Sequence, residues 1–185
     1  MKLVLASGSP RRKEILSDMG LEFTINPSHC DESVDPGTSP SDAVCELAIR
    51  KASTVAAGLP DSLVIGSDTV IDLAGEIIGK PHTPEQAAAT LRALSGRTHI
   101  VRTAVAMVNS NDMRSEVTAA EAQIEFRDLS DDEINAYVAT GEPMDKAGAY
   151  AIQGEGSSLI AKFSGDEDTI IGLPRQAVKE LLARF

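Results

Sequence analysis

The chain has 185 residues, of which 42% are hydrophobic and 24% charged, a composition typical of a folded globular domain and not of a disordered chain. Its 17 Lys and Arg are outnumbered by 28 Asp and Glu, and the net charge of −11 disfavours binding to nucleic acid or to an anionic membrane. No segment approaches the roughly 20 apolar residues of a membrane span, and the N-terminal apolar run is too short for a signal peptide. Cys30 and Cys45 form no CxxC pair and predict free thiols, so we expect a cytoplasmic protein.

The first 25 residues predict a strand, a tight loop, a helix and a second strand at 21–25. An apolar run at 3–6 leads into the loop Ser7–Ser9, and Pro10 stands where a helix favours its first residue, with Ser9 as the expected N-cap. A loop of small residues directs backbone N–H groups toward one point, and the positive end of the helix dipole favours an anion there. Arg11 and Arg12 in the first helical turn fit either an anion site or a solvated basic turn.

The rest of the chain mixes helices and strands. Apolar periodicity and capping residues predict helices at 41–57, at 83–94, at 130–141 and from 174 to the C-terminus. Strands are expected at 63–71, 76–78, 99–108, 117–126 and 158–163, and the residues between 26 and 41 read as a loop. This order, with at least one hairpin, predicts an α/β or α+β domain around a mixed sheet.

Two charged side chains fall at positions that the pattern makes apolar. Lys51 lies in the middle of the apolar stripe of the helix at 41–57, so its ammonium either reaches water past its own stem or meets a phosphate in a cleft. Asp68 interrupts a strongly apolar strand, together with its small and polar neighbours. A carboxylate there is costly without partners, so it is either bonded to nearby backbone or serves as a metal ligand or general base.

Three loop residues complete the candidates. Lys80 stands between Gly79 and a proline that favours an extended backbone, and a lysine held this way can reach a phosphate. Gln153 offers both a donor and an acceptor and can either read a base edge or be solvated in a turn. Glu32 is either a second carboxylate at a metal or a solvated loop acid. Cations and carboxylates together in an acidic protein fit a polyphosphate bound with a hard divalent cation.

These stretches, taken in order, resemble the Maf family of nucleoside triphosphate pyrophosphatases. The matching motifs cover nearly the whole chain and are Leu5–Arg12 (LASGSPRR), Gly66–Val70 (GSDTV), Gly79–Pro81 (GKP), Leu94–His99 (LSGRTH), Asp145–Tyr150 (DKAGAY), Gln153–Gly154 and Gly172–Pro174 (GLP). The resemblance implies one α/β domain over residues 1–185, elongated and two-lobed around a long mixed β-sheet, with the nucleotide in the cleft between the lobes. This fold would be related to that of inosine-triphosphate pyrophosphatases.

The resemblance also implies a reaction, namely hydrolysis between the α- and β-phosphates of a nucleoside triphosphate with a divalent metal cation, Mg²⁺ or Mn²⁺, as cofactor. Asp68 would match the catalytic proton acceptor and Glu32 a further acidic position, and both are candidate metal ligands. The phosphate-contacting positions of the family would be matched by Ser7, Arg12, Lys51 and Lys80. A homodimer is common in such folds, and nothing in the sequence decides it.

The choice of base follows from the branches of the family. This chain resembles the dTTP and UTP branch at Arg11, Thr69 and Gln153, and the 7-methyl-GTP branch less, so pyrimidine nucleotides, normal or modified, are the expected substrates. Residues 166–171 depart from the family, which more often has an aromatic residue and an Asn there. This stretch lies near the end of the cleft, so nucleotide affinity or base preference is expected to differ from that of the family.

Two other interpretations stay open. The start of the chain is similar to that of sugar-nucleotide transferases, although the loop lacks their second glycine and the later motifs do not fit. The association of the family with septum formation also allows a nucleotide-binding regulator with little turnover.

Overall fold

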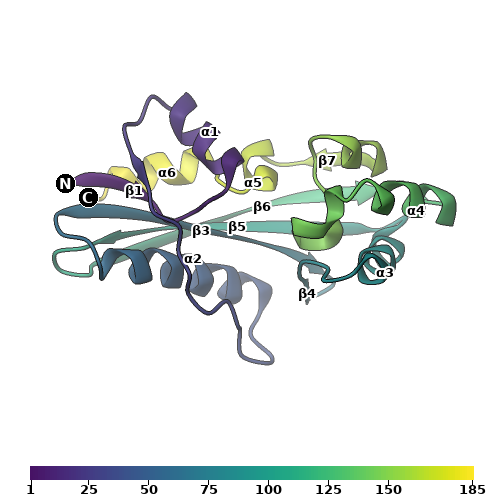
Figure 1. The fold of residues 1–185 in the computed structure, drawn as a ribbon, viewed down its shortest axis with the longest axis horizontal. Coiled ribbons are helices and arrows are strands. Elements are labelled where there is room, and N and C mark those ends of the chain that lie inside the picture. Colours follow the sequence, from purple (N-terminus) through teal and green to yellow (C-terminus); the bar gives the residue numbers. More distant parts are fainter.

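A computed structural model describes residues 1–185 and has the elongated shape shown in Figure 1. One mixed sheet of seven strands runs along the molecule. The strands are β1 (Lys2–Leu5), β2 (Thr24–Ile25), β3 (Ser62–Leu73), β4 (Glu76–Ile78), β5 (Thr98–Asn109), β6 (Ser115–Phe126) and β7 (Ile160–Ser164). The α-helices are α1 (Pro10–Asp18), α2 (Pro40–Ala56), α3 (Pro84–Leu94), α4 (Asp131–Ala139), α5 (Glu167–Ile171) and α6 (Arg175–Leu182). Short 3-10 turns are found at Glu142–Asp145, Ala147–Ala149 and Glu155–Leu159.

The strand order β2-β1-β3-β5-β6-β7 confirms the expected mixed sheet. β1 pairs in parallel with both β2 and β3, whereas β3, β5, β6 and β7 pair antiparallel in turn. β4 pairs antiparallel with the far end of β3 only. The three long central strands have 12 residues each, so they extend through the whole molecule.

Different helices cover the two ends of the sheet, and this arrangement gives two lobes. At the end that holds the termini, α2 covers one face while α1 and α6 cover the other (Figure 1). At the opposite end, α3 and α4 pack with aromatic and aliphatic side chains of β5 and β6. Because β3, β5 and β6 pass through both lobes, we infer that residues 1–185 form one domain.

Helix α2 approaches β3 closely at Gly66. A Cβ atom built on Gly66 would lie 2.3 Å from the carbonyl oxygen of Ala48 and 2.7 Å from the backbone nitrogen of Ala52. The strand expected over 63–71 is confirmed, since β3 runs unbroken through residues 66–69, where the apolar pattern is interrupted. Gly66 stands there because the helix needs the space, and the close approach brings Lys51 of α2 over Asp68.

Two differences from the sequence-based expectations are local. The second strand was expected over 21–25 and spans Thr24–Ile25 only, and α5 was not expected. The other helices begin and end within about three residues of the expected positions, close to the ordinary uncertainty of helix ends. Cys30 and Cys45 are free thiols. No helix has both the length and the apolar character that crossing a membrane requires.

Candidate active site

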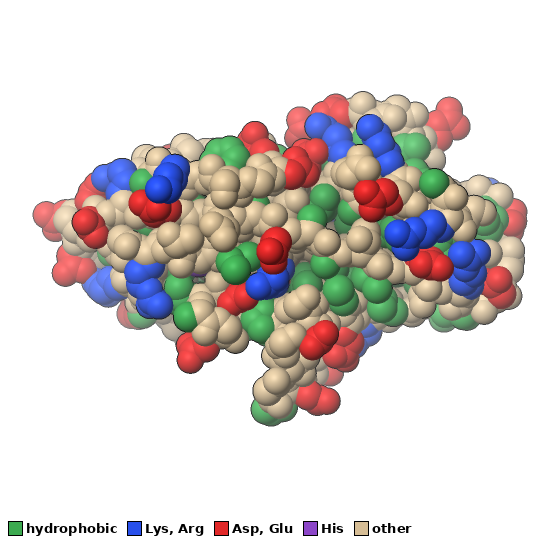
Figure 2. Space-filling view, turned by 180° about the vertical axis from the view of Figure 1, so that it is seen from behind, with side chains coloured by type: hydrophobic (Ala, Val, Ile, Leu, Met, Phe, Trp, Pro, Cys, Tyr) green, Lys and Arg blue, Asp and Glu red, His purple; other side chains and the backbone are tan.

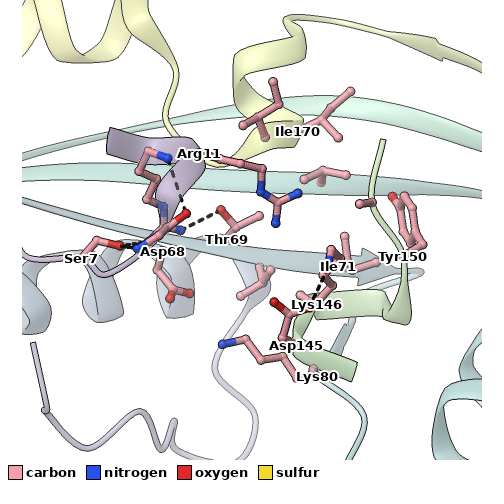
Figure 3. Close-up of a pocket in the computed structure, with 18 of the residues that line it drawn as sticks. Ser7, Arg11, Asp68, Thr69, Ile71, Lys80, Asp145, Lys146, Tyr150 and Ile170 are labelled. Atoms are coloured by element: carbon pink, nitrogen blue, oxygen red, sulfur yellow. Dashed lines mark hydrogen bonds and ion pairs between the residues drawn. The ribbon is translucent and has the colours of Figure 1, made fainter. Parts of the chain in front are cut away.

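A cavity of about 1090 Å³ opens between the two lobes. One side comes from the loop after β1, from α2 and from β3, and the other from the segment after β4 and from residues 142–154 (Figure 3). All nine candidate residues from the sequence line it, namely Ser7, Arg11, Arg12, Glu32, Lys51, Asp68, Thr69, Lys80 and Gln153. Their side chains come from segments up to 146 positions apart (153 minus 7), so the fold, and not sequence proximity, brings them together.

Lys51 joins the two candidate acids. Its Nζ lies 2.6 Å from Oδ1 of Asp68 and 3.0 Å from Oε2 of Glu32. The Lys51 and Asp68 side chains are 12% and 10% exposed, so the ammonium does not escape to bulk water past its stem. Asp68 on β3 therefore has a charged partner on α2, which compensates for the burial of its carboxylate.

The guanidinium of Arg12 is engaged with the protein on every side. Its Nε donates to the carbonyl oxygen of Gly172 at 2.9 Å, and Nη1 donates to the carbonyl oxygen of Ser67 at 2.8 Å. Weaker bonds reach Oγ of Ser7 at 3.4 Å and Oγ1 of Thr69 at 3.3 Å. Burial lowers the pKa of Arg12, with Asp68 acting in the opposite direction. Arg12 thus fastens α1 to β3 and to the C-terminal end of α5 while its charge stays at the cavity wall.

Arg11, by contrast, forms neither a hydrogen bond nor an ion pair, and Figure 3 shows its side chain extending into the cavity. The loop before it is held locally, since Oγ of Ser7 accepts from the backbone nitrogen of Ser9 at 3.2 Å. Ser9 in turn caps α1 by accepting from the nitrogen of Arg12 at 3.4 Å. The expected N-terminal cap of this helix is confirmed.

The opposite wall contains residues to which the sequence analysis gave no role. Lys146 Nζ donates to Oδ1 of Asp145 at 2.6 Å and to the carbonyl oxygen of Glu142 at 2.8 Å. The hydroxyl of Tyr150 shares a 2.6 Å hydrogen bond with Nε2 of the buried His99. Asp145, Lys146, Tyr150 and His99 belong to the motifs 94–99 and 145–150, which the sequence analysis had identified. No local sequence pattern, however, predicts which residues they contact.

The match to the family described as Maf-like protein spans residues 2–185. The chain belongs to the Maf family. Among its curated relatives, a "dTTP/UTP pyrophosphatase" of Moorella thermoacetica is 53% identical over 184 residues, covering 100% of this chain and 95% of the relative. Proteins of the same name from Pelotomaculum thermopropionicum and a Geobacillus species are 43% and 47% identical over 184 and 173 residues. These two alignments cover 100% and 94% of this chain, and 96% and 92% of the relatives.

A solved Mycobacterium abscessus nucleoside-triphosphatase (dITP/XTP pyrophosphatase) aligns with a TM-score of 0.49 at 14% identity, covering 100% of this chain and 95% of that one.

The two acids of this Maf-family cavity, Asp68 and Glu32, fit a divalent cation that is bound together with a substrate. No group of three or more His, Cys, Asp or Glu side chains forms an all-protein metal cage. Asp68 and Glu32 do present carboxylate oxygens to one cation, the ammonium of Lys51. Mg²⁺ is commonly bound by one or two carboxylates together with substrate phosphates, so the donor set fits a metal that arrives with a polyphosphate.

Proposed function

We propose that this protein is a nucleoside triphosphate pyrophosphatase that hydrolyses dTTP and UTP to the nucleoside monophosphate and pyrophosphate. The relatives that share 41–53% of its sequence over nearly full length carry that activity in their names. The observation that carries the proposal is the single cavity that sets the buried carboxylate of Asp68 among the cations Arg11, Arg12, Lys51 and Lys80. A triphosphate needs such a group of cations to be held in an acidic protein.

In the proposed reaction a water oxygen attacks the α-phosphorus. The bond from that phosphorus to the bridging oxygen breaks, and its electron pair leaves with pyrophosphate. Asp68 accepts the proton of the attacking water, because a carboxylate held close to the phosphate can act as a general base. Lys51 and Lys80 stabilise the negative charge that develops on the phosphate oxygens, and Arg12 and Ser7 also line this part of the cavity.

A divalent cation, Mg²⁺ or Mn²⁺, would be held by Asp68 and Glu32 and would neutralise charge on the phosphate oxygens. Lys51 would then contact phosphate oxygens in place of these carboxylates. Its Nζ lies within 3.0 Å of both acids at the cavity wall, so a phosphate that approaches the acids also comes close to the ammonium.

Arg11, Thr69 and Gln153 are the residues proposed to read the base, favouring dTTP and UTP over 7-methyl-GTP. We place the reaction in the cytoplasm, in agreement with the two free thiols. On the face shown in Figure 2, basic and acidic side chains are interspersed, which agrees with a small-molecule substrate and not with nucleic acid. A homodimer stays a prediction of the family resemblance.

A screen of nucleoside triphosphates tests the proposal. It includes dTTP, UTP, CTP, GTP and 7-methyl-GTP with Mg²⁺ or Mn²⁺, and it distinguishes released pyrophosphate from orthophosphate. We expect pyrophosphate from dTTP and UTP and loss of the activity with EDTA. Tight binding without turnover would favour the nucleotide-binding regulator, and a nucleotide sugar formed from UTP and a sugar phosphate would favour the transferase.

A further inference from the structure

The carboxylate of Glu142 is the centre around which the turn after Gln153 is folded. Oε2 accepts the backbone N–H of Glu155 at 3.1 Å, and Oε1 accepts that of Gly156 at 3.1 Å. Oε1 also accepts the hydroxyl of Tyr137 at 2.9 Å. Three donors from two segments therefore converge on one carboxyl group, which lies at the wall of the cavity.

The backbone of the turn is shaped to this carboxylate. Gly154 has φ +79° and ψ −153°, a conformation that is essentially open to glycine alone. A Cβ atom there would lie 2.7 Å from Oε2 of Glu142, and one on Gly156 would lie 2.6 Å from the hydroxyl oxygen of Tyr137. Both glycines are thus needed for the turn to close on Glu142.

This arrangement places a fixed point beside Gln153. The Gln153 side chain lines the cavity, and the N–H groups anchored on Glu142 follow it by two and three positions. Gln153 is itself exposed and has no hydrogen-bond partner of its own in the protein. Its position therefore depends on the backbone of the turn, and the backbone depends on Glu142.

We propose that Glu142 is a positioning residue that sets base selectivity by holding the turn that carries Gln153. The inference rests on the proposed function, in which Gln153 reads the base of dTTP or UTP. A displaced Gln153 loses hydrogen bonds to the base, whereas Ser7, Arg12 and Lys51, which are proposed to hold the phosphates, lie on the other wall, and Lys80 lies outside the turn that Glu142 holds. Loss of Glu142 therefore weakens discrimination between bases and raises KM, with a much smaller change in kcat.

The test compares Glu142→Gln and Glu142→Ala with the wild type. The Gln variant keeps a carbonyl oxygen for Tyr137 and Gly156 but turns an amide toward the N–H of Glu155, whereas the Ala variant removes all three bonds. We expect the ratio of kcat/KM for UTP to that for GTP to fall about 10-fold in Glu142→Gln and further in Glu142→Ala. In a Gln153→Ala background, Glu142→Gln should change the ratio less than 2-fold, about the limit of the assay.

Glu155→Gln is the matched control, since it makes the same chemical change on the same turn and leaves the backbone bond to Glu142 intact. It should keep the wild-type ratio. Amide hydrogen exchange at 155 and 156 should accelerate in Glu142→Gln and not in Glu155→Gln. Binding of α,β-methylene UTP and GTP analogues measures the same selectivity without turnover.

The two proposals fail separately. If the wild type binds the UTP analogue selectively but releases no pyrophosphate, the proposed activity is contradicted. The role of Glu142 is then tested by the selectivity of analogue binding in its variants. An unchanged UTP-to-GTP ratio in Glu142→Ala, in a variant that stays folded, overturns the inference. So does a wild type without selective binding, or a loss of selectivity of equal size in the Gln153→Ala background.

Discussion

Lys51 Nζ lies 2.6 Å from Asp68 Oδ1, across the contact between α2 and β3. Both side chains are about nine-tenths removed from solvent, so each charge depends on the other for compensation. The contact exists because Gly66 lets the backbone of α2 approach the strand. Packing between a helix and a sheet thus sets the geometry of the charged pair at the wall of the cavity.

Replacing Asp68 by Asn should abolish turnover with only a moderate loss of stability. The amide cannot accept the proton of the attacking water, so we expect kcat to fall about 1000-fold. Lys51 keeps Glu32 as a partner at 3.0 Å, and the free energy of unfolding should fall by about 2 kcal/mol or less. Steady-state pyrophosphate release and urea unfolding measure the two effects.

Asp72→Asn is the matched control for this change. Asp72 lies on the same strand, is 7% exposed like Asp68, and accepts from Nε of Arg102 at 2.9 Å, but it does not line the cavity. It should lose a similar amount of stability and keep turnover. Equal losses of turnover in the two variants would show that a buried ion pair in β3, and not the chemistry of Asp68, accounts for the effect.

Gly66→Ala should damage both stability and activity. The new methyl group would meet backbone atoms of α2 at 2.3 and 2.7 Å, which only a shift of the helix can relieve. We expect a loss of about 3 kcal/mol in the free energy of unfolding. The shift moves Lys51 relative to Asp68, and a displacement of about 1 Å can lower kcat roughly 100-fold.

Gly58→Ala serves as the comparison, because a Cβ there meets only the carbonyl oxygen of Val55 at an ordinary 3.8 Å. It should be close to neutral by both thermal unfolding and activity. Wild-type behaviour of Gly66→Ala would contradict the close approach of α2 to β3.

Much of the fold could be predicted from local signals in the sequence. The capping box of Ser130 and Glu133 and the prolines that open α1 and α3 act within one helical turn, so the sequence displays them directly. The helix α5 was missed because five residues are too few to show a period. The reason for Gly66 in a strongly apolar strand was not visible locally, because this glycine makes room for a helix that is distant in the sequence.

The candidate site likewise contains residues that the sequence revealed and contacts that it did not. The charged residues Lys51 and Asp68 stood out because each breaks an apolar pattern, and their convergence followed from family resemblance. The contacts of Arg12 with Ser67 and Gly172, and of Glu142 with residues 155 and 156, left no such mark. Backbone carbonyl and N–H groups are common to all residues, so a sequence does not tell which of them a side chain will bind.

Arg12 and Arg11 should respond differently to replacement by Lys. A lysine cannot donate in the four directions that the Arg12 guanidinium serves, so Arg12→Lys should cost about 2 kcal/mol of unfolding free energy and lower activity. Arg11 has no protein partner, so Arg11→Lys should change stability by less than about 0.5 kcal/mol and act on KM and base preference alone. Equal loss of stability in both variants would contradict the anchoring role of Arg12.

Lys80 should affect substrate affinity without affecting folding. It is exposed at the cavity and forms no ion pair, so its positive charge is available to a phosphate. We expect Lys80→Ala to raise KM for UTP about 10-fold and to leave the unfolding midpoint unchanged. Lys13→Ala, which removes an exposed lysine outside the cavity, should alter neither, and a similar rise in KM there would point to the overall charge.

The buried imidazole of His99 makes stability sensitive to acid. Burial lowers the pKa of His99 from 6.5 to about 4, so the folded protein holds the ring neutral at neutral pH. The unfolded chain binds a proton as the pH falls through 6.5, whereas the folded protein binds none until about pH 4. Protonation therefore favours unfolding in this window, and we expect the free energy of unfolding to fall by about 2 kcal/mol between pH 7.5 and pH 5.

Urea unfolding at these two pH values measures the effect, and two variants assign it to His99. His99→Gln removes the titrating group while leaving a side chain that can still reach the hydroxyl of Tyr150, so its stability should depend less on pH even if it is lower at pH 7.5. His29→Gln changes an exposed histidine and should retain the wild-type dependence of stability on pH.

Carboxylates such as Glu133, with a pKa lowered to about 2, lose their contribution to stability only at lower pH, so they do not account for a change between pH 7.5 and pH 5. A wild-type protein equally stable at both values would mean that the folded state accepts the proton on His99, which requires the imidazole to be less enclosed than its 1% exposure implies.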